Sequence, residues 1–256
     1  MEGKMPVIFA GHGSPLNAIE DNEYSRSWQA MAQQTPRPRA ILSISAHWYT
    51  EGTLVCGSEK PKVVNDMYGF PKELYEVNYS APGDPQLAGR VAELLGGAVR
   101  KDDSWGIDHG SWAVLCKMWP AHYIPVVQLS VNRNMSAREH FDLGTKLRSL
   151  RREGVLIMGS GDVVHNLRLV DWEMAKGCDW AEQFDHYIRD KILARNYDDV
   201  INYASAGEAA KKSVPTPEHY YPLLCVLGAS EEEDKISVFN DSCTLGAISM
   251  TSYMFK

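Results

Sequence analysis

The chain has 256 residues, of which 44% are hydrophobic and 23% are charged, and this composition excludes a disordered or fibrous protein. The net charge of −7, with Lys and Arg scattered along the sequence, provides no basic patch for a phosphate backbone, so we expect no nucleic-acid partner. No apolar run approaches the ~20 residues that cross a bilayer, and the N-terminus lacks a signal-peptide cleavage site. We therefore expect a single domain over residues 1–256 that has no membrane segment and lies in the cytoplasm.

Cysteine usage supports the same location. The sequence has five cysteines and no C-x-x-C pair: Cys56, Cys116, Cys178, Cys225 and Cys243. An odd number of widely spaced cysteines is expected of reduced thiols in a reducing compartment, not of a disulfide framework. Most of them are expected to be small residues of the core.

Short runs rich in Val and Ile alternate with longer segments of helical spacing, which predicts an α/β fold. Strands are predicted at residues 6–10, 40–46, 53–57, 124–130 and 155–159. Helices are predicted at residues 25–34, 85–95, 111–119, 137–152 and 180–195, with Ser136 as the N-cap of the fourth. This alternation predicts a single-domain, three-layer arrangement with a central, mostly parallel mixed sheet flanked by helices.

The C-terminal part adds one helix and two strands. A helix is predicted at residues 217–228, because Thr216 can cap its start, Pro217 fits the first helical position and Gly228 can end it. Strand-like runs follow at residues 235–239 and 244–254. No internal repeat or linker divides the chain.

Three histidines follow predicted strands. His12 stands in Gly11-His12-Gly13 directly after the first strand, His47 follows the second, and His165 comes six residues after the strand at 155–159. Ligands of open α/β sheets bind at the carboxyl ends of the strands, so these side chains are expected to meet in one crevice. A lone histidine at a strand end is more often a structural residue, but three together, with glycines around His12, favour a shared site.

The other histidines lack this position. His109 stands just before a predicted helix, and His219 lies in the first turn of the helix at 217–228. His122, His140 and His186 lie on or beside amphipathic helices and are interpreted as solvated or capping residues.

A group of neutral imidazoles, with or without one carboxylate, suits Zn²⁺ or Fe²⁺ better than Mg²⁺ or Ca²⁺. Zinc takes histidine-rich sites with an open position for water, whereas two histidines and one carboxylate serve Fe(II) oxygen chemistry, and the composition leaves both open. The sequence has no P-loop, complete dinucleotide fingerprint, nucleophile elbow or H-E-x-x-H motif. Ser160, between two glycines, is interpreted as a tight-turn residue.

Five spaced motifs span nearly the whole chain: Gly11-His12-Gly13-Ser14-Pro15, Ser45-Ala46-His47-Trp48, Asp108-His109-Gly110-x-Trp112, Gly159-Ser160-Gly161 with His165-Asn166-Leu167, and Pro215-Thr216-Pro217-Glu218-His219. In this order they resemble the class III extradiol ring-cleaving dioxygenases, specifically the 4,5-DOPA dioxygenase extradiol branch. The resemblance implies that His12 and His47 bind a metal and that His165 acts as acid/base or as a ligand. More distant, protocatechuate-cleaving relatives use a glutamate as the third ligand, whereas the segment here reads Pro-Glu-His. His219, His165 and Glu218, in that order, are therefore the candidates for the remaining position.

The resemblance implies an oxidoreductase that opens the ring of a catechol, such as L-DOPA to 4,5-seco-DOPA, and incorporates both atoms of O₂. One divalent ion per chain is expected, Fe(II) for catalysis, although Zn(II) could be the ion bound because it lies above Fe(II) in the affinity order. His165 or His109 is expected to take a catechol proton and return it. An aromatic wall is expected from Trp48, Tyr49, Tyr68, Phe70, Trp112 and Tyr220.

Two other functions use the same residues. A zinc-dependent hydrolase would attack an ester or amide with a metal-bound hydroxide. A non-catalytic binding protein, like the Memo-type proteins that the family also resembles, would bind a partner without turnover. The natural catechol and the oligomeric state, monomer or homodimer, stay open.

Overall fold

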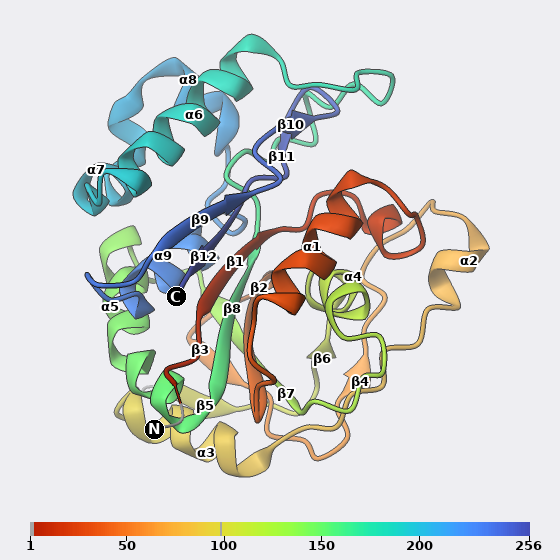
Figure 1. Cartoon of the computed structure of the whole chain (residues 1–256), viewed down its shortest axis with the longest axis vertical. Coiled ribbons are helices and arrows are strands. Elements are labelled where there is room, and N and C mark those ends of the chain that lie inside the picture. Colours follow the sequence, from red (N-terminus) through yellow and green to blue (C-terminus); the bar gives the residue numbers. More distant parts are fainter. Residues whose placement is uncertain (1–2, 98) are drawn as a thin grey trace.

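The computed structural model describes residues 3–97 and 99–256. In this part of the chain the strands of the main sheet are β1 (Val7–Gly11), β2 (Ala40–Thr50), β3 (Thr53–Val55), β5 (Val99–Lys101), β7 (Val126–Asn132), β8 (Val155–Gly161), β9 (Ile236–Phe239) and β12 (Ser252–Phe255). They lie in the order β5-β3-β7-β2-β8-β1-β12-β9 (Figure 1). The central strands β7, β2, β8 and β1 are parallel, and β12 and β9 continue the sheet in antiparallel pairing. The mostly parallel mixed sheet expected from the sequence is confirmed.

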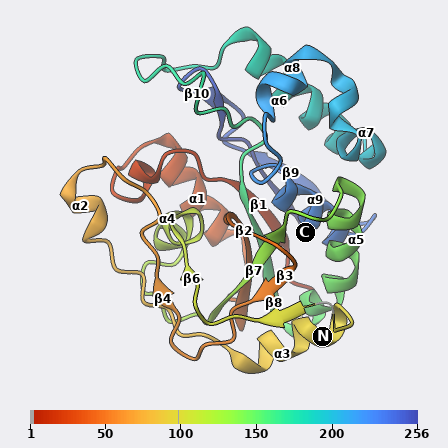
Figure 2. The same ribbon diagram turned by 180° about the vertical axis from the view of Figure 1, so that it is seen from behind.

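Helices cover both faces of this sheet. Within the described residues they are α1 (Glu23–Gln33), α2 (Lys72–Tyr75), α3 (Pro85–Leu94), α4 (His109–Met118), α5 (Ala137–Leu147), α6 (Asp179–Leu193), α7 (Tyr197–Ile201), α8 (Glu208–Ser213) and α9 (Tyr221–Ala229), with the 3₁₀ helices η1 (Pro15–Ala18), η2 (Arg148–Glu153) and η3 (Tyr203–Ala206). Figures 1 and 2 show α1 and α4 on one side of the sheet and α5 and α9 on the other, so the three-layer arrangement is also confirmed. In the described part of the chain, no helix combines the length and the apolar character that crossing a membrane requires.

The apolar side chains of the central strands alternate between two cores. Val7 and Phe9 of β1 belong to the core that α5 and α9 cover, whereas Ile8 and Ala10 belong to the core that α1 and α4 cover. Because both faces of these strands are buried, they read as nearly continuous apolar runs. This is the pattern from which the sequence predicts them.

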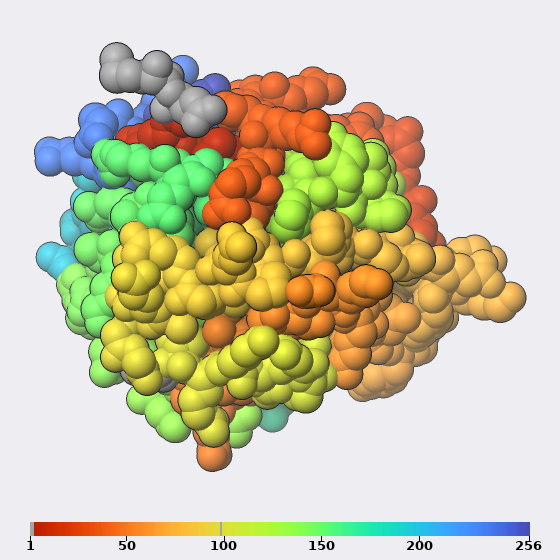
Figure 3. Space-filling model, turned by 90° about the horizontal axis from the view of Figure 1, so that it is seen from below, coloured from red at the N-terminus to blue at the C-terminus, as the bar shows by residue number. Residues whose placement is uncertain are grey.

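Two short strand pairs lie outside the main sheet. β4 (Lys62–Val63) pairs with β6 (Gly106–Ile107), and β10 (Cys243–Thr244) pairs with β11 (Ile248–Ser249). The segment between β4 and α3 carries α2, which projects from the body of the molecule in Figures 1 and 3. These elements are too short to show a period in the sequence, and none of β4, β6, β10 and α2 was predicted.

In the C-terminal part, the predicted helix is confirmed apart from its start, whereas the single strand predicted at 244–254 is wrong. Residues 217–220 form a turn and α9 begins only at Tyr221, since the Thr216 hydroxyl bonds to the Glu218 carboxylate in place of capping a helix. The run at 244–254 is not one strand, because Leu245 and Gly246 adopt positive φ angles of 53° and 72° and turn the chain between β10 and β11.

Glycines allow α9 to lie very close to its neighbours. A Cβ on Gly159 of β8 would lie 2.6 Å from the Pro222 carbonyl oxygen. A Cβ on Gly161 of the same strand would lie 2.1 Å from the His219 carbonyl oxygen. A Cβ on Gly144 of α5 would lie 2.0 Å from the Cys225 carbonyl oxygen. The position of the segment that begins at His219 thus depends on backbone contacts that only glycine permits.

We therefore expect Gly144→Ala to destabilise the protein by about 1–3 kcal/mol through overpacking, although alanine favours helix. Gly89→Ala on α3 is the matched control, because a Cβ there meets no atom within 4 Å, and it should stabilise the protein by about 0.5–1 kcal/mol. Thermal and urea unfolding would measure both. Equal effects of the two substitutions would contradict the close packing of α5 on α9.

Candidate metal centre

The structure brings the three strand-associated histidines to one edge of the sheet, where β1 and β8 end. His12 directly follows β1, and His165 follows β8 by four residues and bridges to Ile248. His47 lies within β2, which continues beyond the predicted end, at an irregularity where the pairing with β7 shifts between Ser45 and Tyr49. A bulge of this kind re-aims side chains, and His47 points toward His12.

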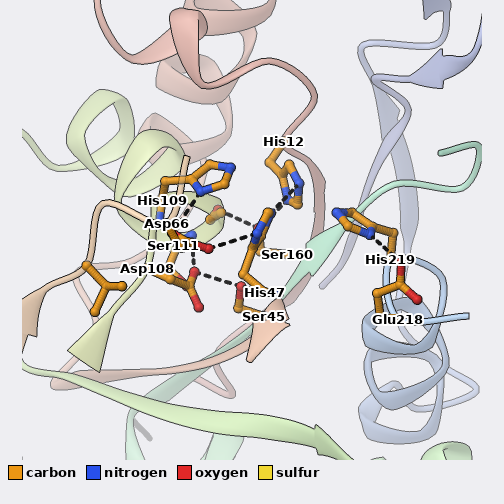
Figure 4. A network of polar contacts seen from close by, with 12 residues as sticks. His12, Ser45, His47, Asp66, Asp108, His109, Ser111, Ser160, Glu218 and His219 are labelled. Atoms are coloured by element: carbon orange, nitrogen blue, oxygen red, sulfur yellow. Dashed lines mark hydrogen bonds and ion pairs between the residues drawn. The ribbon is translucent and has the colours of Figure 1, made fainter. Parts of the chain in front are cut away.

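His109 and His219 join these residues although neither follows a strand. His109 is the first residue of α4, and His219 lies in the turn before α9. The ring centroids of His12, His47 and His219 are 5.0–5.3 Å apart, and that of His109 is 3.9 Å from that of His47 (Figure 4). His165 stacks on His219 with 3.4 Å between ring centroids.

Ser160 fixes the tautomer of His12. The Ser160 hydroxyl donates to the Gly110 carbonyl, so its oxygen accepts the hydrogen bond from His12 Nδ1 at 2.9 Å. His12 Nδ1 therefore carries the ring proton, and Nε2 carries a lone pair. The tight-turn interpretation of Ser160 is wrong, because this residue lies in β8 and supports a histidine.

The carboxylate of Asp66 holds two histidines at once (Figure 4). Its Oδ2 accepts from His47 Nδ1 at 2.9 Å, and its Oδ1 accepts from His109 Nδ1 at 2.8 Å and from the His109 backbone N–H at 3.1 Å. Both rings then carry their proton on Nδ1 and a lone pair on Nε2. Asp66 was not predicted, because it stands in a loop that carries no recognisable motif.

His219 is oriented by its neighbour in sequence. Its Nδ1 lies 3.3 Å from Glu218 Oε1, and its buried Nε2 has no hydrogen-bond partner in the described part of the chain. Figure 4 shows the Glu218 carboxylate on the side of His219 that faces away from His12 and His47. Glu218 thus orients the His219 ring from the side opposite His12 and His47.

These nitrogen atoms fit a divalent metal. Nε2 of His12 and Nε2 of His47 lie 3.3 Å apart although both carry lone pairs, an arrangement that a cation between them would stabilise. Bonds of ~2.0–2.1 Å in a tetrahedral site place two ligand nitrogens roughly 3.3–3.4 Å apart. His12, His47 and His219 form one group whose ligand atoms lie within 4.8 Å of one another. Each ring also has a hydrogen-bond partner at Nδ1, as metal-binding histidines usually do.

Asp162 adds a buried carboxylate to this group. It directly follows β8, its Oδ1 accepts from the Gly13 backbone N–H at 2.9 Å, and its Oδ2 lies 3.2 Å from His12 Nε2. Burial raises the pKa of Asp162 to about 7. The strand-end rule that pointed to His12 could have found Asp162, but the sequence interpretation took the histidines alone.

Burial keeps most of these imidazoles neutral. It lowers the pKa of His12 and His219 well below the ordinary value, and that of His165 to about 3, with neighbouring histidines acting in the same direction. Burial also lowers the pKa of His47, but the hydrogen bond to Asp66 and the nearby carboxylates outweigh it, so the pKa is raised. Neutral imidazole is the form that binds metals.

A cavity of about 420 Å³ opens in front of the histidines, and the cluster of His12, His47, His109, His165 and His219 forms its floor. This volume lies within the roughly 300–1,000 Å³ of small-molecule sites. Tyr68 and Phe70 of the expected aromatic wall line it. The cavity lining does not include Trp48, Tyr49, Trp112 or Tyr220, and the last two are buried in the cores.

The remaining histidines lie outside the cluster. His122 adopts a positive φ of 40°, and His186 is partly exposed beside Glu182. His140 is buried against Tyr221 and bonds to the Ser136 carbonyl, so its solvated interpretation is wrong.

Comparisons with known proteins agree with the motifs. The family model described as the catalytic LigB subunit of aromatic ring-opening dioxygenase matches residues 6–256. The chain is 44% identical to the 4,5-DOPA dioxygenase extradiol of Escherichia coli (strain K12), covering 97% of this chain and 94% of the relative. It is 37% identical to the protein of the same name from Beta vulgaris, covering 97% and 96%.

A solved structure supports the fold as well as the family. The crystal structure of an uncharacterized protein from Escherichia coli K12 matches with a TM-score of 0.86 and 42% identity, covering 99% of this chain and 100% of that one. The chain therefore belongs to the family of the catalytic LigB subunit of aromatic ring-opening dioxygenases, and it is an extradiol aromatic ring-opening dioxygenase.

Proposed function

We propose that this enzyme is metal-dependent and opens the ring of a catechol such as L-DOPA, which would give 4,5-seco-DOPA, with both atoms of O₂ entering the product. One observation carries the proposal: His12 Nε2 and His47 Nε2 lie 3.3 Å apart, each with a lone pair. The buried Nε2 of His219, which has no hydrogen-bond partner among the described residues, lies beside them. The names of the Escherichia coli and Beta vulgaris relatives support the substrate.

His12, His47 and His219 would hold one divalent ion, Fe(II) for catalysis, although the histidine-rich shell would also bind Zn(II) readily. Bound Fe(II) would act as a Lewis acid toward the catechol oxygens and relay electrons from the catechol to O₂. Glu218, proposed from the sequence as one of three candidate ligands, is better suited to orient His219, because its Oε1 faces His219 Nδ1.

Two histidines of the cavity floor are suited to hold the catechol proton. His109 donates its Nδ1 proton to Asp66, so Nε2 is its accepting atom. His165 stacks on His219 in the cavity floor, and its low pKa keeps it neutral at pH 7. A negatively charged catechol oxygen beside either ring would raise the pKa of that ring, so each could accept a proton and return it.

The first experiment is oxygen uptake by protein reconstituted anaerobically with Fe(II), given L-DOPA and simple catechols. We expect equimolar oxygen consumption and a yellow semialdehyde, and His12→Ala should reduce both to background because it removes a ligand atom. Hydrolysis of an ester or amide by the Zn(II)-loaded protein, with no oxygen uptake from any catechol, would instead support the hydrolase. Tight metal binding without turnover of either kind would support a non-catalytic binding protein.

Separate substitutions distinguish the candidates for the third ligand. We expect His219→Gln to lower both metal content and activity, because it removes a ligand nitrogen. His165→Gln should keep stoichiometric metal and lower kcat by about 10²–10⁴-fold, because it removes an acid/base group. Glu218→Gln should keep the metal as well. Elemental analysis beside steady-state kinetics measures these effects, and loss of metal from His165→Gln alone would reverse the assignment.

The shared carboxylate gives a further prediction. In Asp66→Asn the amide nitrogen would face one of the two Nδ1–H groups, which would favour the tautomer whose Nε2 cannot bind metal. We expect metal affinity to fall by about 10–100-fold, measured by competition with a chelator. Asp21→Asn is the control, since this exposed carboxylate pairs with Arg26 at the surface. An unchanged affinity in Asp66→Asn, with the fold intact by circular dichroism, would show that Asp66 does not orient the ligands.

A further inference from the structure

The cavity has a polar floor and an apolar wall. The floor is the histidine cluster, and the apolar wall beyond it includes Met67, Tyr68, Phe70, Leu167, Val170 and Trp172. A catechol whose two oxygens bind a metal held by these histidines needs only the floor. The wall therefore faces the substituents of the catechol ring.

Large apolar side chains at this wall are unusually exposed. Tyr68 is 92% exposed, Leu167 is 65% exposed and Trp172 is 64% exposed, and all of them line the cavity. Exposed apolar groups gathered at a cavity are typical of a ligand-binding surface. An apolar group seated among them would remove this surface from water, which is favourable.

Two loops supply these side chains. Tyr68 lies in the segment that leads into α2, and this segment is tied to the cavity floor by Asp66. Leu167 and Trp172 lie after β8 in a segment that is bonded to the β10–β11 turn, through Asp171 N–H to the Leu245 carbonyl. Because each loop is anchored beside the histidines, the exposed side chains are held at the cavity mouth.

Charge at the wall argues against an amino-acid side chain on the substrate. Within residues 3–97 and 99–256, no lysine or arginine lines the cavity, so no cation there would pair with an α-carboxylate. The carboxylate that lines it, Asp66, already accepts from His47 and His109 with both oxygens, which leaves it poorly placed to pair with an α-ammonium group. Moving either charge from water to such a wall is unfavourable without a partner.

We propose that the preferred substrates are catechols whose ring carries a neutral, apolar substituent, seated between Tyr68, Leu167 and Trp172, in place of the charged side chain of L-DOPA. This inference rests on the proposed function, since it concerns the same cavity and the same reaction. It makes Trp172 and Leu167 specificity-determining residues. Arg168 directly follows Leu167 in the sequence, but its exposed side chain does not line the cavity.

The test compares 4-phenylcatechol, unsubstituted catechol and L-DOPA with the Fe(II)-loaded enzyme, and anaerobic calorimetry measures their binding in the absence of turnover. We expect kcat/KM for 4-phenylcatechol to exceed that for L-DOPA by at least tenfold, mainly through a lower KM, with tighter anaerobic binding to match. Trp172→Ala should reduce the ratio of kcat/KM between 4-phenylcatechol and unsubstituted catechol. Leu193→Ala, which removes an exposed leucine on α6 outside the cavity lining, should keep this ratio.

The outcomes separate the two proposals. Turnover of none of the catechols contradicts the proposed function itself. Turnover of L-DOPA with kcat/KM equal to or above that of 4-phenylcatechol supports the proposed function and overturns the substrate class. In that event, loss of the L-DOPA preference in Arg168→Ala would identify Arg168 as the partner of the carboxylate.

Discussion

The centre depends on hydrogen bonds made at the far side of each imidazole. Ser160, Asp66 and Glu218 each face an Nδ1 atom, and their positions leave Nε2 of His12, His47 and His219 as the atoms that converge. Without these partners each ring could exchange tautomers or turn, and the converging lone pairs would be lost. The proposed site thus gathers nitrogen lone pairs that repel one another in a buried place, an arrangement that a bound cation would stabilise.

The parallel sheet makes this arrangement possible, because it brings distant parts of the sequence to one edge. β1 and β8 end side by side, and the irregularity in β2 turns His47 toward them. Glycines then let α9 lie on β8, so that His219 arrives at the same place from the C-terminal part of the chain. His47 lies within a strand, His12 directly follows one and His219 lies in the turn before α9, whereas longer loops supply most of the cavity wall.

Sequence patterns predict the elements and residues whose place follows from the local sequence. They miss the residues that are placed by contacts between distant segments. The central strands were predictable because burial on both faces makes them apolar throughout, and His12 and His47 because they stand at or near strand ends. His109 and His219 entered only through the family resemblance, since one begins a helix and the other lies in a turn. Asp66 had no signal at all: it reaches His109 because β4 pairs with β6, and two-residue strands leave no pattern to detect.

That same pairing connects the proposed metal ligands to the proposed substrate preference. Asp66 belongs to the loop that carries Met67, Tyr68 and Phe70 to the cavity wall, so the bonds that orient His47 and His109 also hold part of the wall. A carboxylate that accepts from two histidines is poorly placed to pair with a substrate ammonium as well. Because Asp66 orients the proposed ligands, the cavity lining within the described residues offers no other carboxylate to a substrate ammonium group, which favours the neutral substituent proposed above.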